Sequence, residues 1–182
     1  MKLNHSSIQD LCMIGVVTAV IAIMAQIAIP LPLGVPMTMQ TFAITLAGII
    51  LGAKKGAYAS LVYILIGAIG LPVFSNFTGG YQSLIGPVGG FILSFPLMAF
   101  LIGLGTELKQ KRNYFYTLFL IIGTILNLLC GLLLFCIVTQ SSLFVGFTTC
   151  VLPFIPTAII KAVIASMLGF SIKKHIIKAK KY

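Results

Sequence analysis

Lys161 is the residue most able to do chemistry in this 182-residue sequence, because it lies in the middle of an apolar stretch. That stretch, PFIPTAIIKAVIASMLGF, contains no other charged side chain. An ammonium group inside a bilayer costs about 2.5–3.5 kcal/mol on insertion scales, so such residues usually face a cavity or a partner. The two acidic residues, Asp10 and Glu107, lie at the ends of other apolar stretches. Either Lys161 extends to an interface, or an anionic ligand supplies the missing negative charge.

A second concentration of polarity is the passage GLPVFSNFTGGYQSLIGPVGGF, residues 70–91. Its glycines allow left-handed backbone and exposed amide groups, and irregular backbone beside a membrane is tolerated where it lines a polar cavity. The candidate pocket residues combine two glycines, two hydrogen-bonding side chains and one apolar ring: Gly79, Gly80, Asn76, Tyr81 and Phe74. The passage is therefore either a lid over a binding pocket or a Gly-rich turn without a ligand.

The amino-acid composition indicates which kind of structural element holds these residues in place. The sequence is 59% hydrophobic and 8% charged, whereas a soluble domain carries roughly a quarter of its residues as charged side chains. We therefore expect a single all-α integral membrane domain over residues 1–182. Breaker residues divide it into six transmembrane helices, at approximately 10–29, 37–53, 56–71, 86–106, 114–138 and 152–172.

The basic residues outside these spans predict the orientation. They lie in both terminal segments and two alternate gaps: Lys2, Lys54, Lys55, Lys109, Lys111, Arg112, Lys173, Lys174, Lys178, Lys180 and Lys181. The gaps at 30–36, 72–85 and 139–151 contain none. Since Lys and Arg mark cytoplasmic loops, both termini of this multi-pass membrane protein are predicted to lie in the cytoplasm. The basic tail suits anionic membrane lipids; nucleic-acid binding would need a basic face on a soluble body.

The sequence favours a binding protein over an enzyme or an autonomous pump. Gly52-AKK-Gly56 has neither the spacing nor the context of a phosphate-binding loop, and no carboxylate lies in the interior of a span, where a proton relay would need one. A membrane-embedded enzyme using Lys161 would lack a general base, a nucleophile and a metal cluster. We expect no cofactor and no metal site, so concentrative transport would need ATPases in other polypeptides.

Two features bear on helix contacts. Gly15, Ala19 and Ala22 form a stripe of small residues on the first predicted helix, where another helix can approach closely. The stripe serves either a partner protein or packing within the chain. Asn127 lies inside the fifth apolar stretch and is a candidate for a hydrogen bond between helices.

Four stretches resemble the BioY family, the biotin-binding substrate subunit of energy-coupling factor (ECF) transporters. They are QIAIPLPLGVPMTMQT at 26–41, AGIILG at 47–52, YILIGAIGLPVF at 63–74, and the GG-x5-GPVGG pattern at 79–90. The resemblance implies six helices with an outward pocket capped by the loop between the third and fourth. It implies that Asn76 hydrogen-bonds biotin and that Lys161 is a cation of the binding site. It also implies a transmembrane coupling subunit and two cytoplasmic ATPases as partners.

The sequence departs from the family's usual pattern at three positions. Family members commonly carry Asp three residues before the lysine, where this chain has Ala158. The family's GPTGGY is GPVGGF here, so Val88 and Phe91 each lack a hydroxyl group. These departures keep a second ligand open, another small carboxylated vitamin. Biotin has two groups that could meet Lys161, its carboxylate and its ureido group.

Overall fold

The computed structural model describes residues 5–30, 35–108 and 114–179 of the chain. Several basic residues used above to predict the orientation lie outside the described residues: Lys2, Lys109, Lys111, Arg112, Lys180 and Lys181.

Each of the six apolar stretches forms a helix. These are α1 (His5–Ala25), α2 (Gln40–Leu51), α3 (Ala53–Ala68), α5 (Gly89–Leu108), α6 (Tyr114–Thr139) and α8 (Phe154–Ala179). Four of them, α1, α5, α6 and α8, are long and apolar enough to cross a bilayer. With 12 residues α2 is shorter, and α3 has 16. The chain is thus a mainly helical protein with several candidate membrane spans.

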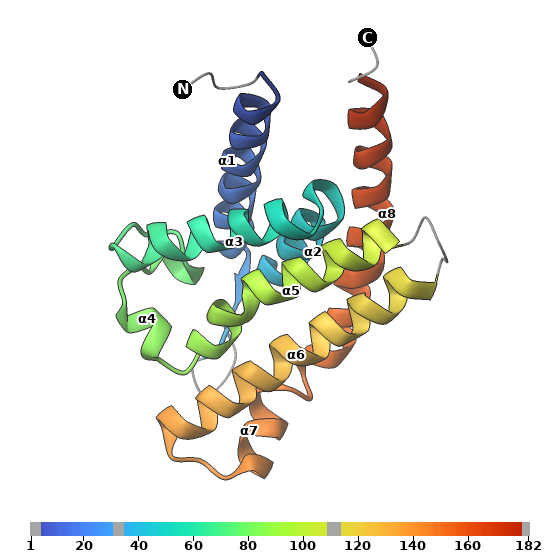
Figure 1. Cartoon of the computed structure of the whole chain (residues 1–182). Coiled ribbons are helices and arrows are strands. Elements are labelled where there is room, and N and C mark those ends of the chain that lie inside the picture. Colours follow the sequence, from blue (N-terminus) through green and yellow to red (C-terminus); the bar gives the residue numbers. More distant parts are fainter. Residues whose placement is uncertain (1–4, 31–34, 109–113, 180–182) are drawn as a thin grey trace.

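Short elements that the apolar pattern does not predict occupy the connections. Strands β1 (Ala28–Ile29) and β2 (Met37–Thr38) pair antiparallel. The connection from α3 to α5 contains a 3-10 turn, η2 (Ser75–Phe77), and the short helix α4 (Gln82–Ile85), and α7 (Leu143–Cys150) follows α6. Figure 1 shows α4 and α7 toward the end of the molecule opposite the two chain ends.

Small residues bring α2, α3 and α5 into close contact. A Cβ atom on Gly103 of α5 would lie 2.3 Å from the backbone nitrogen of Ala53 at the start of α3. A Cβ atom on Gly48 of α2 would lie 2.7 Å from the carbonyl oxygen of Ala99 on α5. Glycine is therefore required where these backbones meet. In turn α6 packs along α5, and α8 packs against α2.

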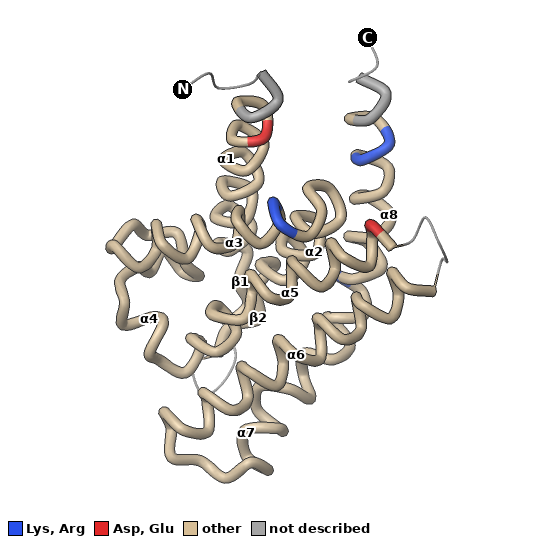
Figure 2. Tube along the Cα trace, in the orientation of Figure 1, with Lys and Arg blue, Asp and Glu red and all other residues tan. Residues whose placement is uncertain are grey.

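Apart from Lys161, the charged residues coloured in Figure 2 lie toward the end of the molecule at which α1 begins and α8 ends. The Asp10 carboxylate on α1 lies 2.6 Å from the Lys55 ammonium group on α3. Glu107 Oε1, near the end of α5, accepts a 2.9 Å hydrogen bond from the backbone N–H of Ala53. An anionic acceptor at the first turn of a helix stabilises that turn. Both acidic side chains of the chain are thus engaged at the corner between α2 and α3.

Candidate ligand-binding site

A cavity lies among α2, α5, α6 and α8, with its lining completed by the connection after β1 and by Ser75. Its volume, counted as the space open to the centre of a water molecule, is about 50 Å³, which is enough for several waters. The lining combines apolar walls with a few polar groups, as small-molecule sites do. The lining residues are Val35, Pro36, Thr38, Gln40, Thr41, Thr45, Ser75, Val88, Phe91, Ile92, Phe95, Met98, Thr124, Asn127, Leu128, Phe154, Ala158, Lys161 and Ala162.

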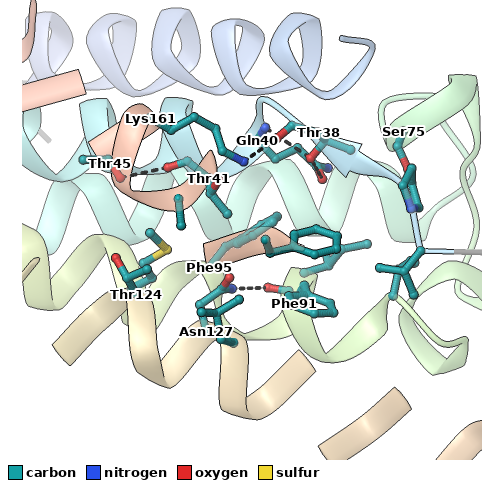
Figure 3. Close-up of a pocket in the computed structure, with 18 of the residues that line it drawn as sticks. Thr38, Gln40, Thr41, Thr45, Ser75, Phe91, Phe95, Thr124, Asn127 and Lys161 are labelled. Carbon is teal, nitrogen blue, oxygen red and sulfur yellow. Dashed lines mark hydrogen bonds between the residues drawn. The ribbon is translucent and has the colours of Figure 1, made fainter. Parts of the chain in front are cut away.

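Lys161 is the cation of this cavity. Its side chain extends from α8 toward strand β2 (Figure 3) and is 8% exposed. The Nζ atom donates a 3.0 Å hydrogen bond to the backbone carbonyl oxygen of Thr38. Neither Asp10 nor Glu107 is among the lining residues. The ammonium group is therefore buried and held by a neutral acceptor, which leaves its positive charge available to a ligand.

The α2 side of the cavity carries a group of polar side chains close to Lys161. Thr38 Oγ1 donates to Gln40 Oε1 at 2.9 Å, and Thr45 Oγ1 donates to the Thr41 carbonyl oxygen at 2.8 Å. The Thr41 hydroxyl is buried and has no hydrogen-bond partner among the described residues. Buried polar groups are nearly always paired, so an unpaired hydroxyl in a cavity wall marks a place for a ligand or a water molecule.

The opposite wall is formed by aromatic rings and a buried amide (Figure 3). Asn127 Nδ2 on α6 donates to the Phe91 carbonyl oxygen at 2.9 Å and to Ser94 Oγ at 2.8 Å, both on α5. This confirms the hydrogen bond between helices predicted for Asn127. Phe91 stacks on Phe154 of α8 with ring centroids 5.9 Å apart, so the wall joins three helices.

The structure places the other predicted site residues around the cavity rather than in its lining. Asn76 and Tyr81 are exposed, and their side chains do not line the cavity as it stands, although the neighbouring Ser75 does. Phe74 is 1% exposed and packs edge-on against Tyr63, with ring centroids 5.5 Å apart.

Gly79 and Gly80 shape the turn that follows these residues. A Cβ atom on Gly79 would lie 2.3 Å from the Leu71 carbonyl oxygen, and Gly80 has φ +93°. The backbone N–H of Gly80 donates to the Gly67 carbonyl oxygen at 2.7 Å. Both glycines are thus needed for the path of the chain beside the cavity. Lys161 is the one predicted site residue in the lining.

The three positions that depart from the family pattern all line the cavity. Ala158 is one helical turn from Lys161 on α8, Val88 immediately precedes α5, and Phe91 lies in the first turn of α5. Residues that the sequence did not single out, Thr38, Gln40 and Thr41, lie within the stretch that carries the VPMTMQT motif. The motif was the signal that could have found them, because it places three polar side chains in an apolar stretch.

The small-residue stripe on α1 divides between two environments. Gly15 and Ala19 are exposed, and a Cβ atom on Gly15 would meet no atom within 4 Å. Ala22 instead packs against the hydrophobic core. The first two positions therefore leave open space beside α1.

A second concavity is an apolar groove of about 850 Å³ between α6 and α8. It shares Thr124, Leu128, Ala158 and Ala162 with the cavity, so these residues form a wall between the two. The groove is lined almost entirely by apolar side chains, which suit acyl chains or another helix. A polar ligand finds its partners in the cavity instead.

Comparisons with known proteins agree with the resemblance seen in the sequence. The profile of the BioY family matches residues 1–178. The biotin transporter BioY of Thermotoga maritima is 40% identical over 162 residues, which are 88% of this chain and 93% of that protein. The biotin transporter BioY2 of Lactococcus lactis subsp. cremoris is 34% identical over 99% of this chain and 98% of its own length.

A solved structure shares the fold. The crystal structure of the S-component for biotin from an ECF-type ABC transporter superimposes with a TM-score of 0.84 at 28% sequence identity. The match covers 96% of this chain and 95% of that one.

Proposed function

The chain belongs to the BioY family, and we propose from this that it takes up biotin as the substrate-binding subunit of an ECF transporter. It is a multi-pass membrane protein and a binding subunit rather than an enzyme. ATP hydrolysis is assigned to partner subunits.

The cavity that contains Lys161 is the proposed biotin site. The observation that carries the proposal is the buried ammonium group, whose hydrogen-bonded partner is the neutral carbonyl oxygen of Thr38. Biotin offers two acceptors to such a donor, the carboxylate and the ureido oxygen. The apolar walls suit its ring system and aliphatic chain, and Asn76 is proposed to bind biotin when the segment beside the cavity closes on it. Tyr81, Gly79, Gly80 and Phe74 belong to the same closing segment.

We propose that the protein is a single domain that crosses the membrane six times, with both termini in the cytoplasm. Six apolar helices support this count, although α2 and α3 are shorter than a full span and would cross together with their flanking residues. Apart from Lys161, the described charged residues lie at the end where α1 begins and α8 ends, and this supports the orientation, since basic residues favour the cytoplasmic side. The connections beside the cavity, at 35–36 and 70–88, then face the outer side of the bacterial inner membrane.

The exposed face of α1 is the proposed contact with the transmembrane coupling subunit, which joins the chain to two ATPase subunits. Support comes from Gly15 and Ala19, which leave open space where a partner helix can approach closely. Ala22 packs against the hydrophobic core of this chain, so it holds α1 in place and is less available for contact with the coupling subunit.

Calorimetric titration of the detergent-solubilised protein with biotin tests the function directly. We expect saturable heat with biotin. Prior saturation of the protein with biotin should abolish this heat, and prior addition of unrelated vitamins should not. A folded sample that gives no heat with biotin would remove the biotin assignment.

A second ligand, another small carboxylated vitamin, is favoured by the lining itself. Ala158, Val88 and Phe91 all line the cavity and each lacks a polar group that family members commonly have there. Competition between biotin, desthiobiotin and other carboxylated vitamins distinguishes the two ligands. Repeating the titrations with biotin methyl ester in the wild type and in a Lys161 variant identifies the end of biotin that meets the lysine. If the carboxylate meets Lys161, esterification and the substitution do not weaken binding additively.

A further inference from the structure

A continuous series of hydrogen bonds runs from the cavity to the connection between α3 and α4. We call this connection, residues 70–81, the cap segment. Thr38, whose carbonyl oxygen holds Lys161, donates through its hydroxyl to Gln40 Oε1 at 2.9 Å. Gln40 Nε2 then donates to the Tyr63 hydroxyl at 2.6 Å. The Tyr63 hydroxyl in turn donates to the Val73 carbonyl oxygen, in the cap segment, at 3.1 Å.

Tyr63 is the central member of this series. It is 0% exposed, and its hydroxyl both accepts from Gln40 and donates to Val73. One neighbour lines the cavity and the other lies in the cap segment, whereas Tyr63 itself does not line the cavity. Movement of the Gln40 side chain therefore changes the hydrogen bonding of the cap segment through the phenol. Buried hydrogen-bond networks of this kind transmit position because each member is fixed by its neighbours.

The cap segment is held on its other side by Gln26, which follows α1. Gln26 Nε2 donates to the carbonyl oxygens of Val73 at 3.3 Å and Phe74 at 3.0 Å, and Gln26 Oε1 accepts from the backbone N–H of Phe77 at 2.9 Å. Val73 is thus the residue where the two sets of hydrogen bonds meet.

The backbone of the cap segment is strained at the residues held in this way. Asn76 has φ 57° and Phe77 has φ 55°. Two consecutive non-glycine residues in the left-handed region are unfavourable and persist where surrounding contacts fix them. Release of one contact therefore lets this segment move, including Asn76, which is proposed to bind the ligand.

We propose that Tyr63 is a positioning residue, which couples occupancy of the cavity at Lys161 and Gln40 to the conformation of the cap segment around Asn76. The inference rests on the proposed function for the identity of the ligand, biotin. The coupling itself is a property of the hydrogen-bond series and is tested with and without ligand.

The sequence contains no tryptophan, so Phe77→Trp introduces a single fluorescent reporter in the cap segment. The Phe77 side chain is 71% exposed, so a larger ring is accommodated there. The experiment compares this parent, in detergent, with the same protein carrying Tyr63→Phe. That change removes the hydroxyl and keeps the ring that packs on Phe74. Tyr58→Phe, on the exposed face of the same helix, is the matched control.

Without ligand, we expect Tyr63→Phe to increase acrylamide quenching of the introduced indole about twofold, and Tyr58→Phe to leave quenching unchanged. With biotin, the parent's emission shifts, and Tyr63→Phe reduces that shift while raising the biotin dissociation rate about 5- to 20-fold, as expected for loss of one or two buried hydrogen bonds. Gln26→Leu releases the cap segment on its other side and is the positive control for the indole. If Tyr63→Phe does not fold, Gln40→Met removes the donor to the Tyr63 hydroxyl and is expected to increase quenching without ligand in the same direction.

Unchanged quenching and an unchanged dissociation rate in folded Tyr63→Phe would overturn the inference, as would a parent whose emission does not respond to bound biotin. Absence of biotin binding in the wild type would overturn the proposed function instead, and the quenching measured without ligand would still decide whether Tyr63 holds the cap segment.

Discussion

The ammonium nitrogen of Lys161 lies 3.0 Å from the backbone carbonyl oxygen of Thr38, a residue 123 positions earlier in the chain. The contact joins α8 to strand β2 across the cavity. An ammonium group has three N–H donors, and this hydrogen bond uses one of them. This hydrogen bond already holds the Lys161 side chain in place. A ligand that accepts from the two remaining donors therefore does not have to order the side chain.

Replacing the cation is expected to weaken ligand binding strongly. Lys161→Met keeps much of the side-chain volume and removes the charge and the donors. Hydrogen bonds to charged groups contribute about 1.5–3 kcal/mol, so we expect the Kd for biotin to rise roughly 10- to 100-fold. Calorimetry on the purified variant measures this. Lys174→Met, at an exposed position on the same helix, controls for loss of a positive charge and should bind as the wild type does.

The unpaired hydroxyl of Thr41 is expected to contribute to ligand binding and not to the stability of the fold. Thr41→Val removes a buried hydroxyl that has no partner among the described residues and keeps the shape of the side chain. Stability should therefore be unchanged or higher, while the Kd for biotin rises about 2- to 10-fold, the value of one neutral hydrogen bond.

Thr45→Val is the matched control for this prediction. The Thr45 hydroxyl also lies in the cavity wall, but it donates to the Thr41 carbonyl oxygen of its own helix. Equal effects of the two substitutions on biotin binding would show that Thr41 has no specific role.

Asn127 is expected to stabilise the contact between α5 and α6. Asn127→Leu removes the hydrogen bonds to the Phe91 carbonyl oxygen and to Ser94 Oγ. We expect a loss of about 1–2 kcal/mol in the free energy of unfolding, because Ser94 still donates to the Phe91 carbonyl oxygen. A thermal unfolding scan in detergent measures this change. Leu133→Ala, exposed on the same helix, should shift the melting temperature less; an equal shift would contradict the prediction.

Substitution on the exposed face of α1 is expected to separate binding from transport. Gly15→Leu fills space in which no atom of this chain lies within 4 Å. The isolated variant should fold and bind biotin normally, yet fail to co-purify with the coupling subunit and to support uptake by cells. Val16→Leu, at the adjacent exposed position, is the control. Normal assembly of the Gly15 variant would place the partner contact elsewhere.

Much of the helical architecture follows from the apolar stretches, because a bilayer requires long runs of apolar side chains whose hydrogen bonds are internal. The boundaries follow less well. The stretch predicted at 37–53 gives a helix at Gln40–Leu51, since Met37 and Thr38 pair with β1 instead. Strand pairing between separate parts of the chain leaves no periodic signal in such a short segment.

The candidate site was partly visible in the sequence. Lys161 stood out because a charge inside an apolar stretch is costly and rare. Thr41 did not, because threonine hydroxyls in membrane helices commonly bond to their own backbone, as Thr45 does. That Thr41 lacks such a partner depends on the local geometry of α2 and on the neighbouring helices. Tyr63 was likewise undistinguished, since its role depends on contacts with Gln40 and Val73.

The position of the two acidic side chains determines which ligands the cavity can admit. Asp10 is paired with Lys55, and Glu107 accepts from Ala53, both away from the cavity. The interior therefore presents a positive field that no side-chain carboxylate of this protein offsets. A cationic vitamin meets electrostatic repulsion there however well its rings fit, and an anion or strong hydrogen-bond acceptor is drawn in. The sign of a ligand's charge is thus the first criterion for entry into the cavity, and the ligand's shape is the second.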